Sequence, residues 1–225
     1  MDSVQVLDAP PRSLRMSYEE YQTWAGEDTI TEWVNGEVIV PMPPQPKHQR
    51  VSDFLLMLMG FFVRLFRLGE VFSAPLEMKP TPTSQAREPD IIFVAQENLG
   101  RVTEQRLAGP ADLIVEVISD ESVARDRVDK FYEYQEIGVR EYWVIDPRPG
   151  KARADFWVLD AREQYRPVPI DDDGIYRSTV IQNFWVRVDW LLADELPDPL
   201  LTFAEIARLP DQVIQVLQRI KAEVR

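Results

Sequence analysis

Short apolar runs on either side of a helical pattern constrain the fold of this chain more than any other feature. Runs rich in β-branched and aromatic residues lie at residues 70–79, 90–95, 112–119 and 141–147. Runs of this kind, bounded by Pro, Gly or acidic residues, predict strands. Between the last two, residues 123–138 place apolar side chains at helical spacing, and Gly138 is a typical helix stop. The order strand, helix, strand predicts an α/β (α+β) protein.

The segments before this unit predict an N-terminal hairpin and a long helix. Ser17 and Glu20 form a capping box that opens a short helix. Asn35-Gly36, between two apolar-rich runs, is a strong hairpin signal, and we expect its two strands to begin the sheet. A helix from His48 to about Phe66 has a broad apolar face, which favours packing against a sheet.

The later segments predict more strands and then helices. Strand-like runs lie at residues 154–168, 171–180 and 184–192, and two short amphipathic helices follow Pro199. We therefore divide the chain into a flexible tail (1–13), a main domain (14–195) and a C-terminal helical extension (196–225). The tryptophan-rich run 184–192 and these helices offer apolar surface, so we expect a homodimer. The alternative is that they close the core of the monomer.

Charge and residue counts exclude several kinds of function. With 25 Lys and Arg against 38 Asp and Glu, the net charge is −13, which repels nucleic acid on average. One His and no Cys exclude multi-histidine and thiolate metal sites and fit a reducing cytoplasm, where we expect the protein. The N-terminus lacks the pattern of a secretory signal, and the apolar stretch 54–63 is too short to span a bilayer. No membrane partner is expected.

Two acidic residues interrupt or open apolar strands. Glu116 lies within the run 113–118, where a buried charge is costly unless it is paired or binds a metal. The alternative is an edge strand on which Glu116 faces water. Asp90 opens the strand 91–94 after Pro89, where it could also be only a turn residue. Two carboxylates on neighbouring strands would suit a divalent metal.

Lys130 could complete such a site from the predicted helix. At 100° per residue it lies roughly 40° from Tyr134, on the flank of the apolar stripe. An ammonium there could orient an attacking water and stabilise charge on a phosphate. The alternative is a lysine that extends along the edge of the core to reach water. The sequence contains no phosphate-loop, dinucleotide-binding or nucleophile-elbow motif.

The ordered series of these motifs resembles the Uma family of restriction-endonuclease-like proteins, formerly a domain of unknown function, in the PD-(D/E)XK nuclease superfamily. The resemblance covers roughly residues 16–190. It rests on residues 32–37, His48, Arg87-Glu88-Pro89-Asp90, 112–119, Asp126, Lys130, Tyr134 and 138–147. It implies a mixed β-sheet flanked by helices. Asp90 and Glu116 match the acidic metal ligands of the superfamily, with Mg²⁺ or Mn²⁺ as the cofactor.

The resemblance also implies roles for other residues. The usual lysine of the superfamily, two residues after the second acid, is replaced here by Ile118, so Lys130 would supply the ammonium. Glu37 and His48 match family positions and are accessory candidates, although His48 could equally cap or pack a helix. The function implied is a divalent-metal-dependent endonuclease acting on DNA. The alternatives are an inactive nuclease-like binding or regulatory module, or a metal-dependent enzyme on a small phosphorylated substrate.

Contact with DNA would need a basic region on this acidic chain. Residues 42–87 contain six Lys or Arg against three acids, a local excess of three. The helix turn at 125–130 could add to this region if it faces the same cleft. We therefore expect DNA to contact Lys47, Arg50, Arg87 and Arg127.

Overall fold

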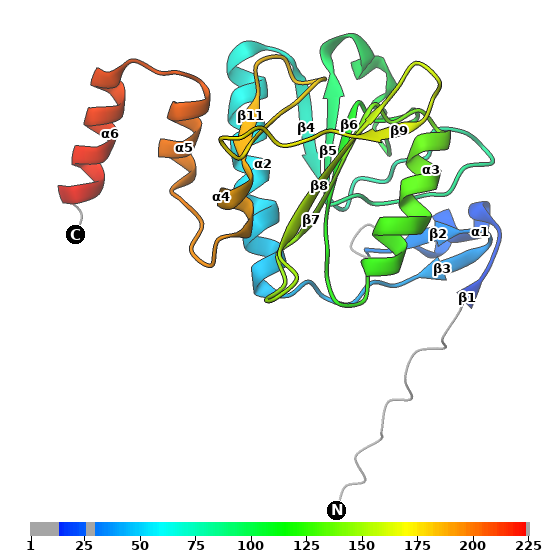
Figure 1. Cartoon of the computed structure of the whole chain (residues 1–225). Helices are drawn as coiled ribbons and strands as arrows, with labels where there is room; N and C mark the ends of the chain where they lie inside the picture. The colour runs from blue at the N-terminus through cyan, green and yellow to red at the C-terminus, as the bar shows by residue number, and fades with distance from the viewer. Residues whose placement is uncertain (1–13, 26–29, 224–225) are drawn as a thin grey trace, which may run out of the picture.

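A six-stranded sheet forms the centre of the structure, a computed structural model that describes residues 14–25 and 30–223. Its strands, in order, are β4 (Gly69–Ser73), β5 (Ile91–Ala95), β6 (Leu113–Val117), β7 (Glu141–Asp146), β8 (Arg153–Leu159) and β9 (Tyr165–Pro167). β6 and β7 are parallel, and the other neighbouring pairs are antiparallel. The sheet is mixed and has helices on both faces, which confirms the predicted fold class (Figure 1).

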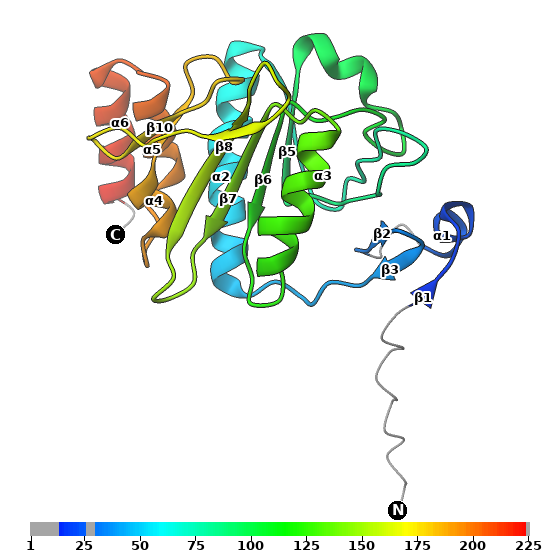
Figure 2. The ribbon, with the colours of Figure 1, turned by 45° about the vertical axis from the view of Figure 1, so that its right-hand side comes forward.

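The strand–helix–strand unit of the sequence joins the parallel pair. After β6, a π-helical turn covers Arg125–Asp129 and continues into α3 (Lys130–Glu136). Gly138 ends this segment with a φ of +84°, a conformation that glycine adopts without strain. α3 lies on one face of the sheet and α2 (Pro46–Phe66) on the other (Figure 2). A short 3₁₀ turn, Gln96–Arg101, follows β5.

Alternating side chains of β6 enter two cores. Val115 is fully buried in one cluster with Phe54 of α2, and Ile114 is fully buried in the other with Tyr134 of α3. Burying a large apolar side chain contributes about 1.5–3 kcal/mol, so these two clusters hold both helices on the sheet. Glu116 points to the same face as Ile114, toward α3, because side chains of a strand alternate.

The N-terminal hairpin belongs to a separate sheet. β1 (Leu14–Arg15), β3 (Glu37–Ile39) and β2 (Glu32–Val34) form three strands in that order, next to α1 (Tyr18–Trp24), whose capping box is confirmed. The Asn35-Gly36 turn is also confirmed, with positive φ at both residues. The expectation that these strands begin the main sheet is wrong. β2 instead pairs with the segment before β5, through two hydrogen bonds of 2.9 and 3.0 Å between Trp33 and Ala86. The predicted tail 1–13 lies outside the described residues.

The C-terminal region adds a two-stranded ribbon and three helices. β10 (Ile175–Arg177) and β11 (Trp185–Arg187) are antiparallel. The strand predicted through residue 192 ends early, because Val188–Leu192 forms α4. Val188 and Leu191, three positions apart, are buried on one side of this helix. The two predicted terminal helices are confirmed as α5 (Pro199–Ile206) and α6 (Asp211–Glu223).

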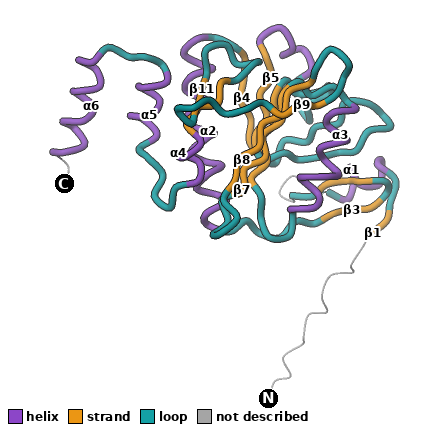
Figure 3. Tube along the Cα trace, viewed as in Figure 1, coloured by secondary structure: helices purple, strands orange, loops and turns teal. Residues whose placement is uncertain are grey.

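α5 and α6 differ in how they are held. The ring of Phe203 in α5 lies 5.7 Å from that of Phe61 in α2, and Phe203 and Ile206 are part of the main core. No described residue of α6 is buried. These helices lie on the opposite side of the main sheet from β1–β3 (Figure 3). The boundary at residue 195 and the homodimer stay predictions. None of the described helices has the length and apolar character needed to cross a bilayer.

Candidate active site

Glu116 lies in the interior of the main sheet. β6 has β5 and β7 as neighbours, and the side chain of Glu116 is only 4% exposed. The alternative interpretation, an edge strand with Glu116 facing water, is therefore wrong. A carboxylate at this depth needs partners that offset its lost hydration.

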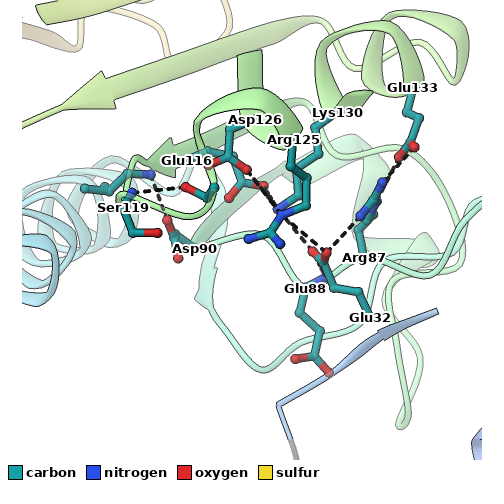
Figure 4. A network of polar contacts seen from close by, with 12 residues as sticks. Glu32, Arg87, Glu88, Asp90, Glu116, Ser119, Arg125, Asp126, Lys130 and Glu133 are labelled. Atoms are coloured by element: carbon teal, nitrogen blue, oxygen red, sulfur yellow. Dashed lines mark hydrogen bonds and ion pairs between the residues drawn. The ribbon is translucent and has the colours of Figure 1, made fainter. Parts of the chain in front are cut away.

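The register of β5 and β6 brings Asp90 beside Glu116. Ile91 pairs with Val115 in this antiparallel ladder, so Asp90 lies level with Glu116 on the neighbouring strand. The Oδ2 atom of Asp90 accepts a hydrogen bond of 2.7 Å from the backbone N–H of Val117. The two acids that the sequence pairs are thus placed side by side at one end of the sheet (Figure 4).

Lys130 reaches Glu116 from the start of α3. Its Nζ donates a hydrogen bond of 2.7 Å to Oε1 of Glu116, and the hydroxyl of Tyr134 donates to the same atom at 2.8 Å. The side chain of Lys130 is 3% exposed. The alternative in which Lys130 extends along the core edge to water is wrong, because its ammonium lies inside a cluster of carboxylates.

Burial and charge shift the titration of this cluster. Burial raises the pKa of Glu116 to about 8, with Asp126 and Asp90 adding to the rise and Lys130 opposing it. Burial lowers the pKa of Lys130, but the charges of Glu116 and Glu32 raise it by more, so the ammonium stays protonated. Burial also raises the pKa of Asp126. Near neutral pH the cluster therefore holds a proton that a bound cation would displace.

Glu32 also belongs to this cluster, although the sequence interpretation gave neither it nor Asp126 a role in the site. Its carboxylate enters from β2, lies 3.1 Å from Nζ of Lys130, and accepts a hydrogen bond of 2.8 Å from Arg87. Burial raises the pKa of Glu32, but Lys130, Arg87 and Arg125 together lower it to about 2. The hairpin pattern around Asn35-Gly36 gave no sign that the preceding strand faces a helix 98 positions later.

A cavity of about 580 Å³ opens beside these groups. It lies between α2, the segment before β5, the end of β6 and the π-helical turn. Its lining contains six acids against three basic residues. The acids are Glu32, Asp53, Glu88, Asp90, Glu116 and Asp126, and the basic residues are His48, Arg125 and Lys130. Burial, and then the charge of Glu32, raises the pKa of Glu88 to about 8. A lining this acidic favours cations and disfavours a bare phosphate.

The donor atoms fit a hard divalent cation. Asp90 and Glu116 each accept hydrogen bonds through one carboxylate oxygen, and the other oxygen of each accepts none from the described residues. Two further carboxylate oxygens, Oε2 of Glu88 and Oδ1 of Asp126, are buried and have no hydrogen-bond partner among the described residues. Among the described residues, no three His, Asp or Glu side chains are arranged to hold a metal ion by themselves. Asp90 and Glu116 would leave positions for water and substrate oxygens, as is common for Mg²⁺.

The two accessory candidates separate in the structure. His48, in the first turn of α2, has Nε2 3.2 Å from Oδ2 of Asp90. Burial lowers the pKa of His48, but the hydrogen bond and charge of Asp90 raise it above its usual value overall. Glu37 does not line the cavity, because it lies on β3 and its side chain pairs with Arg15. Of the two, the structure brings only His48 to the site.

The four residues expected to contact DNA do not form one surface. Arg87 is buried and held by Glu32 and Glu133, so its guanidinium is not available to a phosphate. This part of the expectation is wrong. Arg127 pairs with Asp155 on β8 and does not line the cavity.

The other two lie on the first turns of α2. Lys47 pairs with Asp194, and Arg50 is exposed. The basic excess counted along residues 42–87 therefore includes one buried arginine that cannot contact DNA.

Comparisons with known proteins give two findings. A family model described as Uma2, putative restriction endonuclease, matches residues 18–189. A solved structure, described as a putative nuclease belonging to DUF820 from Anabaena variabilis ATCC 29413, has a TM-score of 0.63. The alignment covers 79% of this chain and 97% of that chain at 15% sequence identity, so it shows a shared fold. No curated protein sequence matches this chain.

Proposed function

Because this chain belongs to the Uma2 putative restriction endonuclease family, we propose that it is a divalent-metal-dependent nuclease that hydrolyses DNA phosphodiester bonds. The observation that carries this proposal is the convergence of Asp90, Glu116 and Lys130 beside an acidic cavity. This arrangement fits the acid, acid and lysine set of the PD-(D/E)XK superfamily, with the lysine supplied from α3.

Each residue has a distinct role in this proposal. Asp90 and Glu116 would hold Mg²⁺ or Mn²⁺, and the ion, when bound, would polarise the scissile phosphate as a Lewis acid and lower the pKa of a bound water. Lys130 fixes the carboxylate of Glu116 and places positive charge near the charge that develops on the phosphate. His48 orients Asp90 through their 3.2 Å contact. Of the expected DNA contacts, Lys47 and Arg50 stay in the proposal, since both lie near the start of α2.

A second function uses the same residues on a different substrate. The cavity lining has three more acidic than basic residues, counting the six acids and three basic residues named above. A small phosphorylated substrate that arrives with its own cation meets less repulsion there than a polyanion does. We therefore keep hydrolysis of a small phosphate ester as the alternative, alongside a nuclease-like module that binds without turnover.

The test is a cleavage assay with Mg²⁺ or Mn²⁺ on single-stranded and duplex DNA, run beside a small phosphomonoester and a phosphodiester. Glu116→Gln should lower DNA cleavage by about a thousandfold, equivalent to roughly 4 kcal/mol in the barrier. Asp129→Asn is the matched control, because Asp129 is an exposed acid in the neighbouring turn.

Each outcome selects one function. Cleavage of DNA that is lost only with Glu116→Gln supports the nuclease. Turnover of the small esters alone supports the alternative. Binding of DNA without turnover under either metal leaves the binding module.

A further inference from the structure

The π-helical turn before α3 changes which side chains share a face. The backbone N–H of Lys130 donates to the carbonyl of Arg125, five residues earlier. In a regular α-helix, residues five apart lie about 140° apart around the axis, on different faces. The wider π turn places them one above the other. Single π turns of this kind are frequent at functional sites.

The two arginines of this turn consequently face different surroundings. Arg125 lines the cavity with Lys130. Arg127 donates a hydrogen bond of 2.6 Å to Asp155 and lies 3.7 Å from Asp146, both on the sheet side and away from the cavity lining. The two residues have similarly exposed side chains, 24% and 26%. They differ in what they face.

The guanidinium of Arg125 lacks a close acceptor. Its Nε is buried without a hydrogen-bond partner among the described residues. The nearest carboxylate oxygens are on Asp126 at 3.8 Å and Glu32 at 4.0 Å, beyond hydrogen-bond distance. The same oxygen of Glu32 already accepts from Arg87 at 2.8 Å. In Figure 4 the guanidinium is seen between Asp90 and Glu32.

We propose that Arg125 binds a phosphate oxygen of the substrate in this cavity. The proposal rests on the proposed function, since it places the substrate beside Asp90 and Glu116. An unsatisfied donor at a buried site is costly, and a planar guanidinium matches the two-oxygen edge of a phosphate. Within the cavity lining, Lys130 is paired with Glu116 and Glu32, and His48 contacts Asp90 through Nε2. Nε of Arg125 has no hydrogen-bond partner among the described residues.

The test compares Arg125→Gln with Arg127→Gln, two neutralised arginines of one turn. The probe is a fluorescein-labelled oligodeoxynucleotide, single-stranded or duplex, and fluorescence polarisation gives its dissociation constant in Ca²⁺, which binds carboxylate oxygens. Gel electrophoresis shows that the probe stays intact. Arg125→Gln should weaken binding by about tenfold or more, the loss of one hydrogen bond to a charged group. Arg125→Lys should recover part of this, because a lysine keeps the charge without the fork.

A salt titration distinguishes the loss of a phosphate contact from a loss of protein stability. Losing one phosphate contact should flatten the slope of log K against log salt by about 0.7–0.9. A change in stability alone would not alter this slope, and urea unfolding of both variants reports stability directly.

The outcomes keep this proposal apart from the proposed function. Unchanged affinity and slope in Arg125→Gln, or equal losses in both variants, overturn the role of Arg125. If the native protein binds the probe but cleaves no DNA with Mg²⁺ or Mn²⁺, the nuclease proposal fails while the comparison still decides the role of Arg125. If the native protein binds neither probe, both proposals fail.

Discussion

Glu141 and Glu116 are both buried acids on neighbouring strands of one sheet, and they have opposite kinds of partner. Glu141, at the start of β7, accepts six hydrogen bonds through both carboxylate oxygens, all from neutral groups. The donors are Trp143 Nε1, Tyr176 OH, Ser178 Oγ, Thr179 N and Oγ1, and Val180 N. Glu116 accepts through Oε1 only, from Lys130 and Tyr134, and it lines the cavity.

This difference in hydrogen-bond donors indicates a structural role for Glu141 and a functional role for Glu116. Neutral donors saturate Glu141 and leave no lone pair for a ligand, so its carboxylate ties β7 to residues 176–180. Glu116 keeps one oxygen free among the described residues and shares its other oxygen with an ammonium. Burial alone therefore does not identify a functional carboxylate. What distinguishes Glu116 from Glu141 is the carboxylate oxygen that accepts no hydrogen bond from the described residues.

The largest effect that we expect on stability tests the structural role of Glu141. Glu141→Gln should lower the free energy of unfolding by about 3 kcal/mol, because the amide turns an NH₂ group toward donors and leaves them unsatisfied. Glu116→Gln should cost less than about 1 kcal/mol, since the amide oxygen can still accept from Lys130. Urea unfolding of both variants measures the contrast. Equal losses would show that the two acids are structurally equivalent.

A somewhat smaller effect is expected at Lys130. Lys130→Gln should slow DNA cleavage by roughly a hundredfold, since a positioned cation beside phosphate charge contributes about 3 kcal/mol. Lys130→Arg should not restore the full rate, because the planar guanidinium cannot replace a compact ammonium among three carboxylates. Binding of Mn²⁺, followed by calorimetry, should survive in both variants. Cleavage at the native rate in Lys130→Gln would remove Lys130 from the mechanism.

The choice of glutamine at position 130 follows from the burial of the side chain. Alanine would remove the ammonium that pairs with the buried carboxylate of Glu116, and breaking a buried pair costs about 3–5 kcal/mol and could unfold the protein. Glutamine keeps a donor in reach of Glu116, so the change in rate can be measured on folded protein.

The smallest effect concerns the proton held by Glu116. A cation must displace it, so Mn²⁺ affinity should rise by roughly tenfold per pH unit up to about pH 8, where the raised pKa of Glu116 lies. Without metal, the free energy of unfolding should instead fall as the pH rises. The bound proton stabilises the fold below the unfolded pKa of Glu116, and this contribution is lost as the pH rises through about 8. Calorimetry at several pH values measures the first effect, and Glu116→Gln should flatten it.

The sequence predicted most elements of the fold because their signals are local. Short apolar runs rich in β-branched and aromatic residues, the capping box at Ser17 and the Asn35-Gly36 turn each specify structure within a few residues, and all three are confirmed. The placement of the hairpin could not be predicted in the same way. It depends on the pairing of Trp33 with Ala86, which no local pattern encodes.

The same division holds for the site. Glu116 could be found from the sequence because a charge in an apolar strand stands out, and the antiparallel register then places Asp90 beside it. Residues 32–37 and the turn at 125–130 were noted in the sequence, but the places of Glu32 and Arg125 in the site could not be predicted, since each owes its position to backbone features visible only in three dimensions. A small separate sheet carries the first. A π turn orients the second, and its sequence reads as an ordinary helix.

The docking of Glu32 from that small sheet also bears on the order of folding. Glu116 and Lys130 are 14 positions apart in the chain, whereas Glu32 and Arg87 are 55 apart. Closing the longer loop costs more entropy, so contacts across short separations form first. The main sheet, with Glu116 and Lys130, can therefore assemble before the N-terminal hairpin packs against it. The carboxylate of Glu32 then joins the cluster in a late step of folding. Catalytic competence would then lag behind the acquisition of secondary structure during refolding.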